Sequence, residues 1–365
     1  MSKHLKIYFL VPYPLKYSPG QRFRFEHFLP YFSSQKIDYT VSPFMNEAFY
    51  KILCTKKNFL KMVLTILGYC KRCLDIIKII FGKYDLVFIY RETTPLRGIF
   101  FEKILTVCNK KIIFDFDDAI FLPPIHTDQK WIKSLKNPSK VKEIVQLSNL
   151  VLVGNQYLKD FATQYNQQVE IFPTLINTDF HIPKKENIQN KKNSLCIGWT
   201  GSYFTLPYLY TLKFVFKKLS NQYPYLYFKI IGASSFATWE GIPIKTIPWS
   251  LRDEIQQLQE IDIGLMPLTH DPFSQGKCGF KALQYMSLEI PAVCSPVGIS
   301  TTIIQDGING FLCHSEEEWI QKLQLLIENE DLRKKLGKEG RKTVIQFYSV
   351  EQYKNTFFKH IQNLI

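Results

Sequence analysis

The chain has 365 residues, of which 46% are hydrophobic and 21% charged, a composition that excludes extensive disorder. This length exceeds that of a single hydrophobic core and predicts two domains. The net charge is +14, and 25 Lys and Arg against 15 Asp and Glu place most of the excess in residues 1–180.

The basic excess of the first half indicates an anionic partner. Anionic membrane lipids or a lipid-linked pyrophosphate acceptor would bind to such a positively charged surface. The alternative is a general bias toward lysine in the composition, which would give the same charge without any partner. Nucleic acid would also satisfy the charge, but the sequence contains no nucleic-acid-binding motif. We therefore expect no nucleic acid partner and a peripheral contact with an anionic membrane.

Two features of the sequence bear on localisation. The first apolar stretch, Ile7 to Val11, is too short for a secretory signal and predicts a strand instead. Eight scattered cysteines lack the spacing of a zinc site and predict reduced, buried thiols. We expect a cytoplasmic protein, peripheral at the inner face of the membrane where its basic half meets lipid.

The first half alternates short apolar runs with longer amphipathic segments, which is typical of a parallel sheet covered by helices. These apolar runs are Lys6 to Val11, Leu86 to Tyr90, Lys111 to Phe116 and Leu150 to Val153. Ligands of such sheets bind at the carboxyl ends of the strands.

The loop after the first run contains Gly20 and leads into a helix that carries Arg22. A glycine loop between a strand and a helix binds phosphate in many α/β proteins, so both residues are expected to contact a phosphate or an anionic acceptor. A solvent-exposed Arg22 at the start of the helix is the alternative. The loop lacks the three-glycine dinucleotide fingerprint, which disfavours a nicotinamide or flavin cofactor.

The longest apolar region, Phe59 to Phe81, contains five charged residues and cannot span a bilayer. It predicts a pair of helices packed on the sheet. The alternative is a basic amphipathic surface that lies along a membrane.

Three carboxylates, Asp115, Asp117 and Asp118, follow the third apolar run. Alternation along the strand turns Asp115 and Asp117 to one side and Asp118 to the other. We expect Asp117 or Asp118 to act in catalysis or to orient an acceptor, with helix capping as the alternative. The cluster has no clear partner ligands for a metal ion.

The polar, aperiodic stretch His181 to Asn193 predicts a linker. We expect a first domain over residues 1–180, a second over 181–346, and a C-terminal helix in 347–365 that packs back on the first domain. The predicted strands of the second domain are Leu195 to Trp199, Tyr227 to Ile231, Asp262 to Met266 and Pro291 to Ser295. Its predicted helices are Leu206 to Leu219, Leu251 to Gln259, Gly279 to Ser287 and Glu316 to Ile327.

Two further candidates lie in the second half. Gly201 and Ser202 follow its first predicted strand, where their backbone amides would bind phosphate, although Ser202 is equally suited to cap a helix. Trp249 precedes a predicted helix and would flank a nucleobase, although a buried core position is the alternative.

The stretch from Gly276 to Gly298 is the most informative and predicts a turn, a helix, a strand and a second turn. A helix that starts near Gly279 offers backbone amides and the positive end of its dipole to an anion. Lys277 and Lys281 stand four residues apart on one face, which favours a diphosphate. The alternative is a solvated lysine pair on an ordinary helix.

The motifs of both halves together resemble the retaining GT-B glycosyltransferases of glycosyltransferase family 4, also called glycosyl transferases group 1. The resemblance covers nearly the whole chain. It rests on residues 21–24, 114–119, 153–158, 172–174, 197–202, 262–268, 276–287 and 291–298.

This resemblance implies a GT-B fold, in which two doubly wound Rossmann-like α/β domains face a central cleft, and a metal-independent reaction without a cofactor. With the residue patterns above, we expect the catalytic residues to be Asp117, Asp118, Lys277 and Lys281. The expected donor-binding residues are Gly20, Arg22, Gly201, Ser202, Trp249, Lys277, Cys278, Gly279, Phe280, Lys281 and Gln284.

Two positions depart from the family pattern. Most relatives carry two glutamates in the Gly276 to Gln284 segment, the second of which binds the donor ribose, whereas this chain has Gly276 and Gln284 at those positions. Gln284 can still hydrogen-bond a diol but brings no negative charge. Many relatives also place an Arg and a Lys after the first strand of this domain, where this chain has Thr200, Gly201 and Ser202.

The expected function is transfer of a hexosyl group from a nucleotide-diphosphate sugar to a hydroxyl acceptor, with retention of configuration. The acceptor would be a glycan or a lipid-linked glycan in cell-surface polysaccharide biosynthesis. The alternatives are a nucleotide-sugar-binding protein without catalysis and a GT-B nucleotide-sugar epimerase.

Overall fold

The structure is a computed structural model that describes residues 5–52, 58–95, 98–123, 137–184, 194–233, 236 and 239–365. The chain forms two compact units, an N-terminal unit (Met1–Thr174 with Tyr353–Ile365) and a C-terminal unit (Leu175–Gln352). The first stretch of the N-terminal unit thus ends a few residues before the boundary expected at residue 180. Most of the expected linker, residues 185–193, lies outside the described residues.

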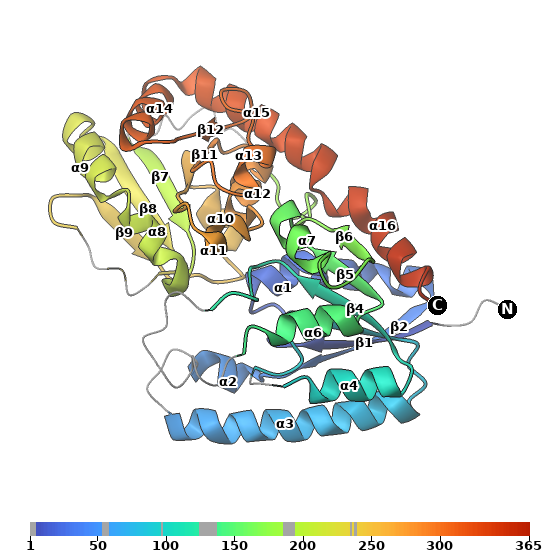
Figure 1. The fold of residues 1–365 in the computed structure, drawn as a ribbon. Helices are drawn as coiled ribbons and strands as arrows, with labels where there is room; N and C mark the ends of the chain where they lie inside the picture. The colour runs from blue at the N-terminus through green and yellow to red at the C-terminus, as the bar shows by residue number, and fades with distance from the viewer. Residues whose placement is uncertain are drawn as a thin grey trace. The chain divides into compact units, whose positions relative to one another are not determined.

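The N-terminal unit is built on a parallel sheet with the strand order β2-β1-β3-β4-β5-β6 (Figure 1). Its described strands are β1 (Leu5–Val11), β2 (Ile37–Pro43), β3 (Leu86–Tyr90), β4 (Lys111–Phe116), β5 (Leu150–Val153) and β6 (Val169–Ile171). Its described helices are α1 (Pro19–Arg24), η1 (Glu26–Tyr31), η2 (Ser33–Gln35), α2 (Glu47–Ile52), α3 (Asn58–Phe81), α4 (Phe100–Val107), α6 (Lys140–Leu147) and α7 (Gln156–Ala162). The four central strands are the four apolar runs that the sequence predicts.

The C-terminal unit repeats this plan, with the strand order β12-β11-β10-β7-β8-β9. Its described strands are β7 (Leu195–Thr200), β8 (Leu226–Ile231), β9 (Ile244–Ile247), β10 (Ile263–Met266), β11 (Ala292–Cys294) and β12 (Phe311–Leu312). Its described helices are η3 (Tyr203–Thr205), α8 (Leu206–Tyr210), α9 (Lys213–Gln222), α10 (Glu254–Leu258), α11 (Pro272–Gln275), α12 (Phe280–Ser287), α13 (Ser300–Ile303), α14 (Glu316–Glu328) and α15 (Glu330–Phe347). Two parallel sheets with flanking helices confirm the α/β class, while the single helix expected over Leu206 to Leu219 is in fact α8 followed by α9.

The last helix, α16 (Val350–Gln362), enters the N-terminal unit at Tyr353. Its Phe357 is 1% exposed and stacks on Phe28 with the ring centroids 4.4 Å apart. The same ring lies 5.6 Å from Phe172 and 6.1 Å from Phe88 of β3. Within this unit, α16 therefore completes the aromatic core on one side of the sheet.

The region from Phe59 to Phe81 forms one continuous helix, α3, and the expectation of two helices is wrong. The charged residues Arg72 and Asp75 do not mark a turn between two helices. They lie within the single helix and are buried on its inner face. Cys70 and Cys73 are exposed on this helix, against the expectation that the thiols are buried. In the described part of the chain, no helix is both long enough and apolar enough to cross a bilayer.

A buried arginine holds α3 against the sheet. Arg72 is 0% exposed and forms an ion pair of 2.9 Å with Asp75. Its remaining donors reach the backbone carbonyls of Thr93 (2.7 Å), Ser42 (2.8 Å) and Val11 (2.7 Å). The inner face of α3 is therefore attached by polar contacts at the carboxyl ends of the neighbouring strands.

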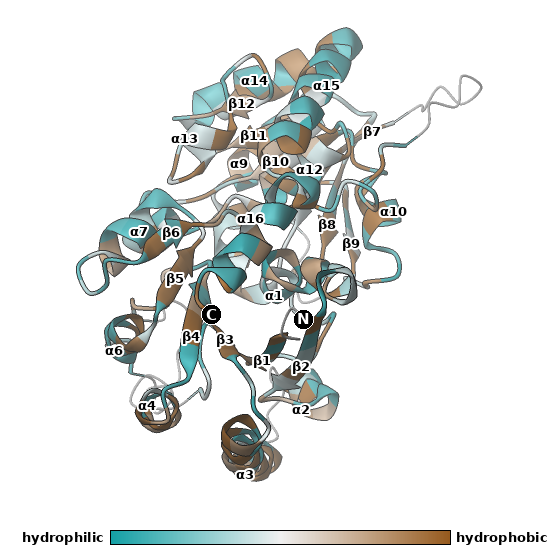
Figure 2. Ribbon diagram, turned by 90° about the vertical axis from the view of Figure 1, so that its right-hand side faces the viewer, coloured by the Kyte–Doolittle hydropathy of each residue, from teal (hydrophilic) through white to brown (hydrophobic). Residues whose placement is uncertain are grey.

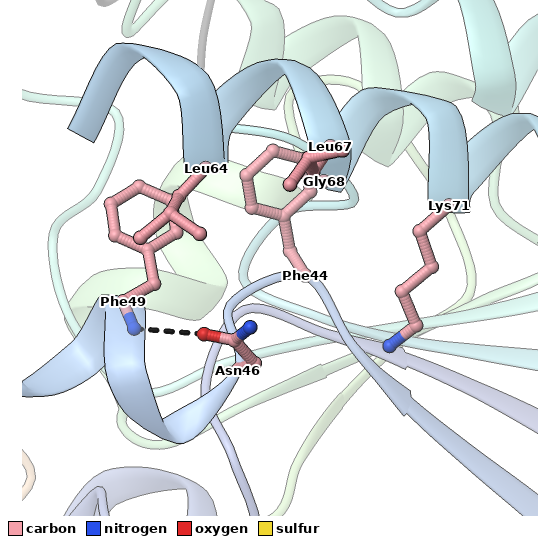
Figure 3. A pocket seen from close by; sticks show the side chains of 7 residues that line it. All are labelled: Phe44, Asn46, Phe49, Leu64, Leu67, Gly68 and Lys71. Atoms are coloured by element: carbon pink, nitrogen blue, oxygen red, sulfur yellow. Dashed lines mark hydrogen bonds between the residues drawn. The ribbon is translucent and has the colours of Figure 1, made fainter. Parts of the chain in front are cut away.

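Close packing completes this attachment (Figure 3). Gly68 of α3 faces Phe44, and a Cβ at position 68 would lie 2.6 Å from the phenyl ring. Leu64, from the same helix, and Phe49 of α2 line the small hollow beside this contact. Because its glycine brings the backbone onto an aromatic ring, α3 is fixed in rotation about its axis.

Candidate functional site

The N-terminus of α12 is held in a fixed position in the C-terminal unit. Gly279 precedes the helix with a φ of 68°, and a Cβ there would collide with Ile303, so only glycine fits. One turn into the helix, the Tyr285 hydroxyl accepts a hydrogen bond from the Thr200 amide of β7 (2.9 Å). Gly264 of β10 leaves the room that the Tyr285 ring occupies. These contacts join the start of α12 to the carboxyl end of β7.

Lys281, in the first turn of α12, lies over the indole of Trp199, with its Nζ 4.2 Å from the ring centroid. Its Nζ also lies 3.5 Å from Thr205 Oγ1, and no carboxylate pairs with it in the described part of the chain. Burial, followed by the charge of Lys277, lowers the pKa of Lys281 to about 7. This lysine is therefore half-buried and electrostatically unsatisfied, unlike a solvated lysine on an ordinary helix.

The residues around the start of α12 differ in what they contact. Lys277 lies over Phe273, with its Nζ 4.3 Å from the ring centroid. Cys278 is 6% exposed and points inward, with its Sγ 3.6 Å from the Gly276 carbonyl. Phe280, the first residue of α12, is half-buried. Two cations thus lie at this turn, each against an aromatic ring.

In the turn after β7, the backbone amides of Gly201 and Ser202 donate hydrogen bonds to acceptors in the same unit. The Gly201 amide donates to the Ile231 carbonyl (2.9 Å), and the Ser202 amide donates to Thr205 Oγ1 (3.1 Å). Ser202 is the N-cap of the short helix η3. The expected cradle of free amides at Gly201 and Ser202 is therefore not seen, because both amides already have acceptors.

Gly232, at the carboxyl end of β8, escaped the sequence reasoning. It has a φ of 94°, and a Cβ there would collide with the Gly201 carbonyl and come within 3.5 Å of Trp249 Cβ. Gly201, Gly232 and Trp249 are therefore neighbours at the ends of adjacent strands. The sequence does contain a signal for this residue, because a glycine directly after a buried strand indicates a tight turn.

Glu254 of α10 is a second residue that the sequence reasoning missed. This carboxylate is 7% exposed, and its Oε1 accepts from Trp249 Nε1 (3.0 Å) and Gln284 Nε2 (3.4 Å). Trp249 is half-buried rather than a core residue, and Gln284 is 1% exposed. The negative charge that Gln284 itself lacks is thus present beside it.

The N-terminal unit gathers a second set of candidates around Asp117. A Cβ at Gly20 would lie 2.8 Å from Asp117 Oδ2 and 2.6 Å from the Tyr90 hydroxyl, so only glycine fits against this cluster. Asp117 Oδ1 accepts from the Tyr90 hydroxyl (2.9 Å) and from Arg91 Nε (2.8 Å). Arg91 directly follows β3 with a φ of 59°, an uncommon conformation for a residue other than glycine.

The charges of this cluster are largely paired. Arg91 Nη2 lies 2.7 Å from Asp117 Oδ1 and 3.7 Å from Asp118 Oδ2. Burial would raise the pKa of Asp117, but the charges of Arg91 and Arg24 outweigh it, and the pKa is lowered. Asp117 is therefore a stable carboxylate near neutral pH.

Arg24 lies in the segment 21–24, one of those on which the family resemblance rests. Its Nε donates to Asp115 Oδ2 (3.0 Å), and its Nη1 donates to the Phe172 carbonyl. Arg22 is 7% exposed, with its guanidinium 4.9 Å from the centroid of the Phe23 ring, so the alternative of a solvent-exposed Arg22 does not hold. Of the two arginines of α1, one therefore neutralises Asp115 and the other is buried beside the loop.

Acidic residues do not form a metal site in the part of the chain that the structure describes. Two arginines, Arg24 and Arg91, lie among Asp115, Asp117 and Asp118 and supply the positive charge that a metal ion would bring. Asp118 Oδ1 accepts from the neighbouring Ala119 amide (3.2 Å).

Comparison with known proteins bears on both units. Residues 211–343 match the model of the family Glycosyl transferases group 1, and this stretch includes Lys277 and α12 with its Lys281. This confirms the group recognised from the motifs, while the finer placement in family 4 stays a prediction. No curated protein matches the sequence.

Solved structures match the whole chain at low identity. Sucrose-phosphate synthase from Thermosynechococcus elongatus is 11% identical with a TM-score of 0.70, and the match covers 99% of each chain. HepE from Anabaena, in complex with UDP-glucose, is 13% identical with a TM-score of 0.67, covering 99% of this chain and 100% of that one. A glycosyltransferase from Rickettsia africae is 13% identical with a TM-score of 0.68, covering 100% and 99%. These likenesses confirm the expected fold, two doubly wound α/β domains of the GT-B type.

Proposed function

We propose that this chain, with its GT-B fold and its match to glycosyl transferases group 1, transfers a hexosyl group from a nucleotide-diphosphate sugar to a hydroxyl acceptor with retention of configuration. The observation that carries the proposal is Lys281 at the fixed start of α12, half-buried over Trp199 and paired with no carboxylate among the residues that the structure describes. Charging this lysine is costly in the free protein, and an anionic ligand would offset that cost.

The diphosphate is the part of the donor that these lysines would meet. When the glycosidic bond breaks, negative charge grows on the departing diphosphate, and Lys277 and Lys281 would bind that charge more strongly than the charge of the intact donor. The positive end of the α12 dipole acts in the same direction. The N-terminus of α12 is rigid, because Gly279 and Tyr285 fix it, so the cations need no rearrangement during the reaction.

A UDP-sugar is the first donor to examine, since UDP-glucose and UDP are bound in the HepE structures. Gln284 and Glu254 would together contact the donor ribose, the amide as a hydrogen-bonding group and the carboxylate as the charge that Gln284 lacks. Trp249, held by the same carboxylate, would flank the base.

The acceptor would be a glycan or a lipid-linked glycan of a cell-surface polysaccharide, bound by the N-terminal unit at the inner face of the membrane in the cytoplasm. Asp117 supports an orienting role, because its lowered pKa makes it a hydrogen-bond acceptor but a weak base. Asp118, whose Oδ2 lies 3.7 Å from Arg91 Nη2, would face the same acceptor.

Donor binding should not require a divalent metal or a cofactor. Lys277 and Lys281 supply the positive charge that a metal ion gives to a diphosphate elsewhere. Calorimetric titration with UDP should therefore give the same affinity in the presence of a chelator and of magnesium. Binding that appears only with magnesium or manganese would contradict the role of the two lysines.

The transfer itself is tested by incubating the protein with UDP-sugars and simple glycan acceptors, followed by NMR of the product anomer. A retained configuration supports the proposal. Binding of UDP-sugar without transfer or hydrolysis would instead support the binding protein, for which Gly276 and Gln284 are the motivating departures. Epimerised free sugar nucleotide would reveal the epimerase.

Binding of a diphosphate should also take up a proton at mildly alkaline pH. Lys281 has a pKa of about 7 in the free protein, and a bound anion would raise it, so the affinity for UDP should fall by up to about tenfold per pH unit above pH 7. The free protein should show the opposite trend. Above pH 7 its folded form releases a proton that the unfolded chain keeps up to the ordinary lysine pKa, so its stability should rise with pH.

Calorimetry at pH 8 in two buffers of different ionisation enthalpy measures this proton uptake. The Lys281→Met variant should lose it, while Lys217→Met, on an exposed position of α9, should retain it. Equal proton uptake in wild type and Lys281→Met would assign the titration to another group.

A further inference from the structure

The outer face of α3 is apolar along its whole length. Phe59, Ile66 and Phe81 are 75%, 57% and 78% exposed, and large side chains recur between them. At 100° per residue, the exposed apolar positions 59, 60, 62, 66, 67, 74, 77 and 81 fall within a sector about 160° wide. A monomeric soluble protein rarely exposes so continuous an apolar stripe.

The packing of α3 does not explain this stripe. The helix already uses its opposite face against the sheet, where Gly68, Arg72 and Asp75 are buried. The inner face thus buries the ion pair together with Ile76 and Ile79, and the large apolar residues of the outer face have no packing role there. The outer face is free to meet another apolar medium.

The neighbouring helix α4 extends the same surface. Its Phe100 and Val107 are 67% and 81% exposed, and α4 packs beside α3. Figure 2 shows both helices in brown, next to each other at one end of the N-terminal unit. Two adjacent helices therefore present apolar side chains to solvent together.

All the exposed charge on these two helices is positive. Their acidic residues, Asp75 and Glu102, are both 2% exposed. Lys78 of α3 and Lys103 of α4 are exposed, and Lys83 follows in the turn after α3. An apolar stripe bordered by lysines, with no exposed carboxylate on either helix, matches a surface that carries negative charge.

We propose that the α3–α4 face docks in the plane of a bilayer that contains anionic phospholipid, with the apolar stripe at the acyl boundary and the lysines at the phosphates. The alternation of exposed Lys with Phe, Ile and Leu is the pattern of an interfacial helix. Protein interfaces favour Arg and are depleted in Lys, which disfavours a protein partner. This inference concerns the N-terminal unit alone and does not depend on the donor chemistry.

Vesicle sedimentation tests the inference with the full chain. Wild type should bind vesicles of mixed phosphatidylglycerol and phosphatidylcholine, bind pure phosphatidylcholine more weakly, and lose part of the difference as salt is raised to physiological strength. The variant I66E/I77E places charges in the stripe and should reduce partitioning by about tenfold or more on both vesicles. K78E/K103E should remove the preference for the anionic vesicles.

Controls separate docking from misfolding and from the glycosyl-transfer proposal. Phe214→Glu changes a side chain of α9 that is 56% exposed, and it should sediment like wild type. All variants should keep the wild-type melting temperature, and I66E/I77E should bind UDP as wild type does, because it leaves the C-terminal unit unchanged. UDP binding that fails in wild type would count against the proposed function without touching this inference.

Three outcomes would overturn the inference. The first is wild-type protein that binds neither kind of vesicle. The second is I66E/I77E that sediments like wild type. The third is a wild-type dimer in size-exclusion chromatography that I66E/I77E converts to a monomer, which would assign the face to a second copy of this chain.

Discussion

Replacing Lys281 by Ala is expected to lower turnover about a hundredfold to a thousandfold, equivalent to roughly 3–4 kcal/mol of transition-state stabilisation. The charge that is lost would meet the diphosphate at the moment its negative charge grows. Lys277→Ala should fall in the same range. Steady-state kinetics with saturating donor measures both effects.

The unliganded protein should melt at no lower temperature in either variant, because Ala favours the helix and, at position 281, the substitution removes an amine that is costly to charge where it is buried. Lys217→Ala, on the exposed face of α9, should keep full turnover. Near-normal turnover in both Lys277→Ala and Lys281→Ala would remove this segment from the active site. The main support that the residues themselves give to glycosyl transfer would disappear with it.

Replacing Arg72 by Met is expected to destabilise the N-terminal unit by about 3–5 kcal/mol, since it leaves the buried carboxylate of Asp75 without its counter-charge. Three backbone carbonyls would also lose their donor. For a unit of this size, such a loss lowers the melting temperature by about 6–20 °C. Differential scanning calorimetry would record the shift.

A double variant, R72M/D75N, removes both charges and should recover part of the lost stability, because no buried ion remains unpaired. Lys78→Met, at an exposed position of the same helix, should change the stability by less than about 0.5 kcal/mol. A loss below about 1 kcal/mol for Arg72→Met would show that the polar inner face does not hold α3 to the sheet.

The central strands could be predicted from the sequence, and the edge strands could not. A central strand of a parallel sheet is covered on both faces, so β3 and β7 are buried at every residue and are continuous apolar runs. The four edge strands, β2, β6, β9 and β12, are not predicted from the sequence. β9, for example, has no buried residue, and its Lys and Thr mask the pattern.

The candidate site was predictable as a segment but not as a set of contacts. The glycines and lysines around α12 are neighbours in sequence, and a helical pattern is enough to place them on one face. Trp199 under Lys281, Arg91 beside Asp117 and Glu254 beside Gln284 come from other strands or helices. Which strands are adjacent in a sheet is a tertiary property that local patterns do not contain.

The position of Phe357 has a consequence for the order of folding during synthesis. This ring completes the aromatic core of the N-terminal unit, yet the whole C-terminal unit separates it in the chain from Phe28, on which it stacks. The ribosome therefore releases a first unit whose core lacks one large aromatic ring, a deficit that typically corresponds to about 3–5 kcal/mol. Until the second unit has been made, the first remains an incomplete intermediate, so the two units mature together rather than one after the other.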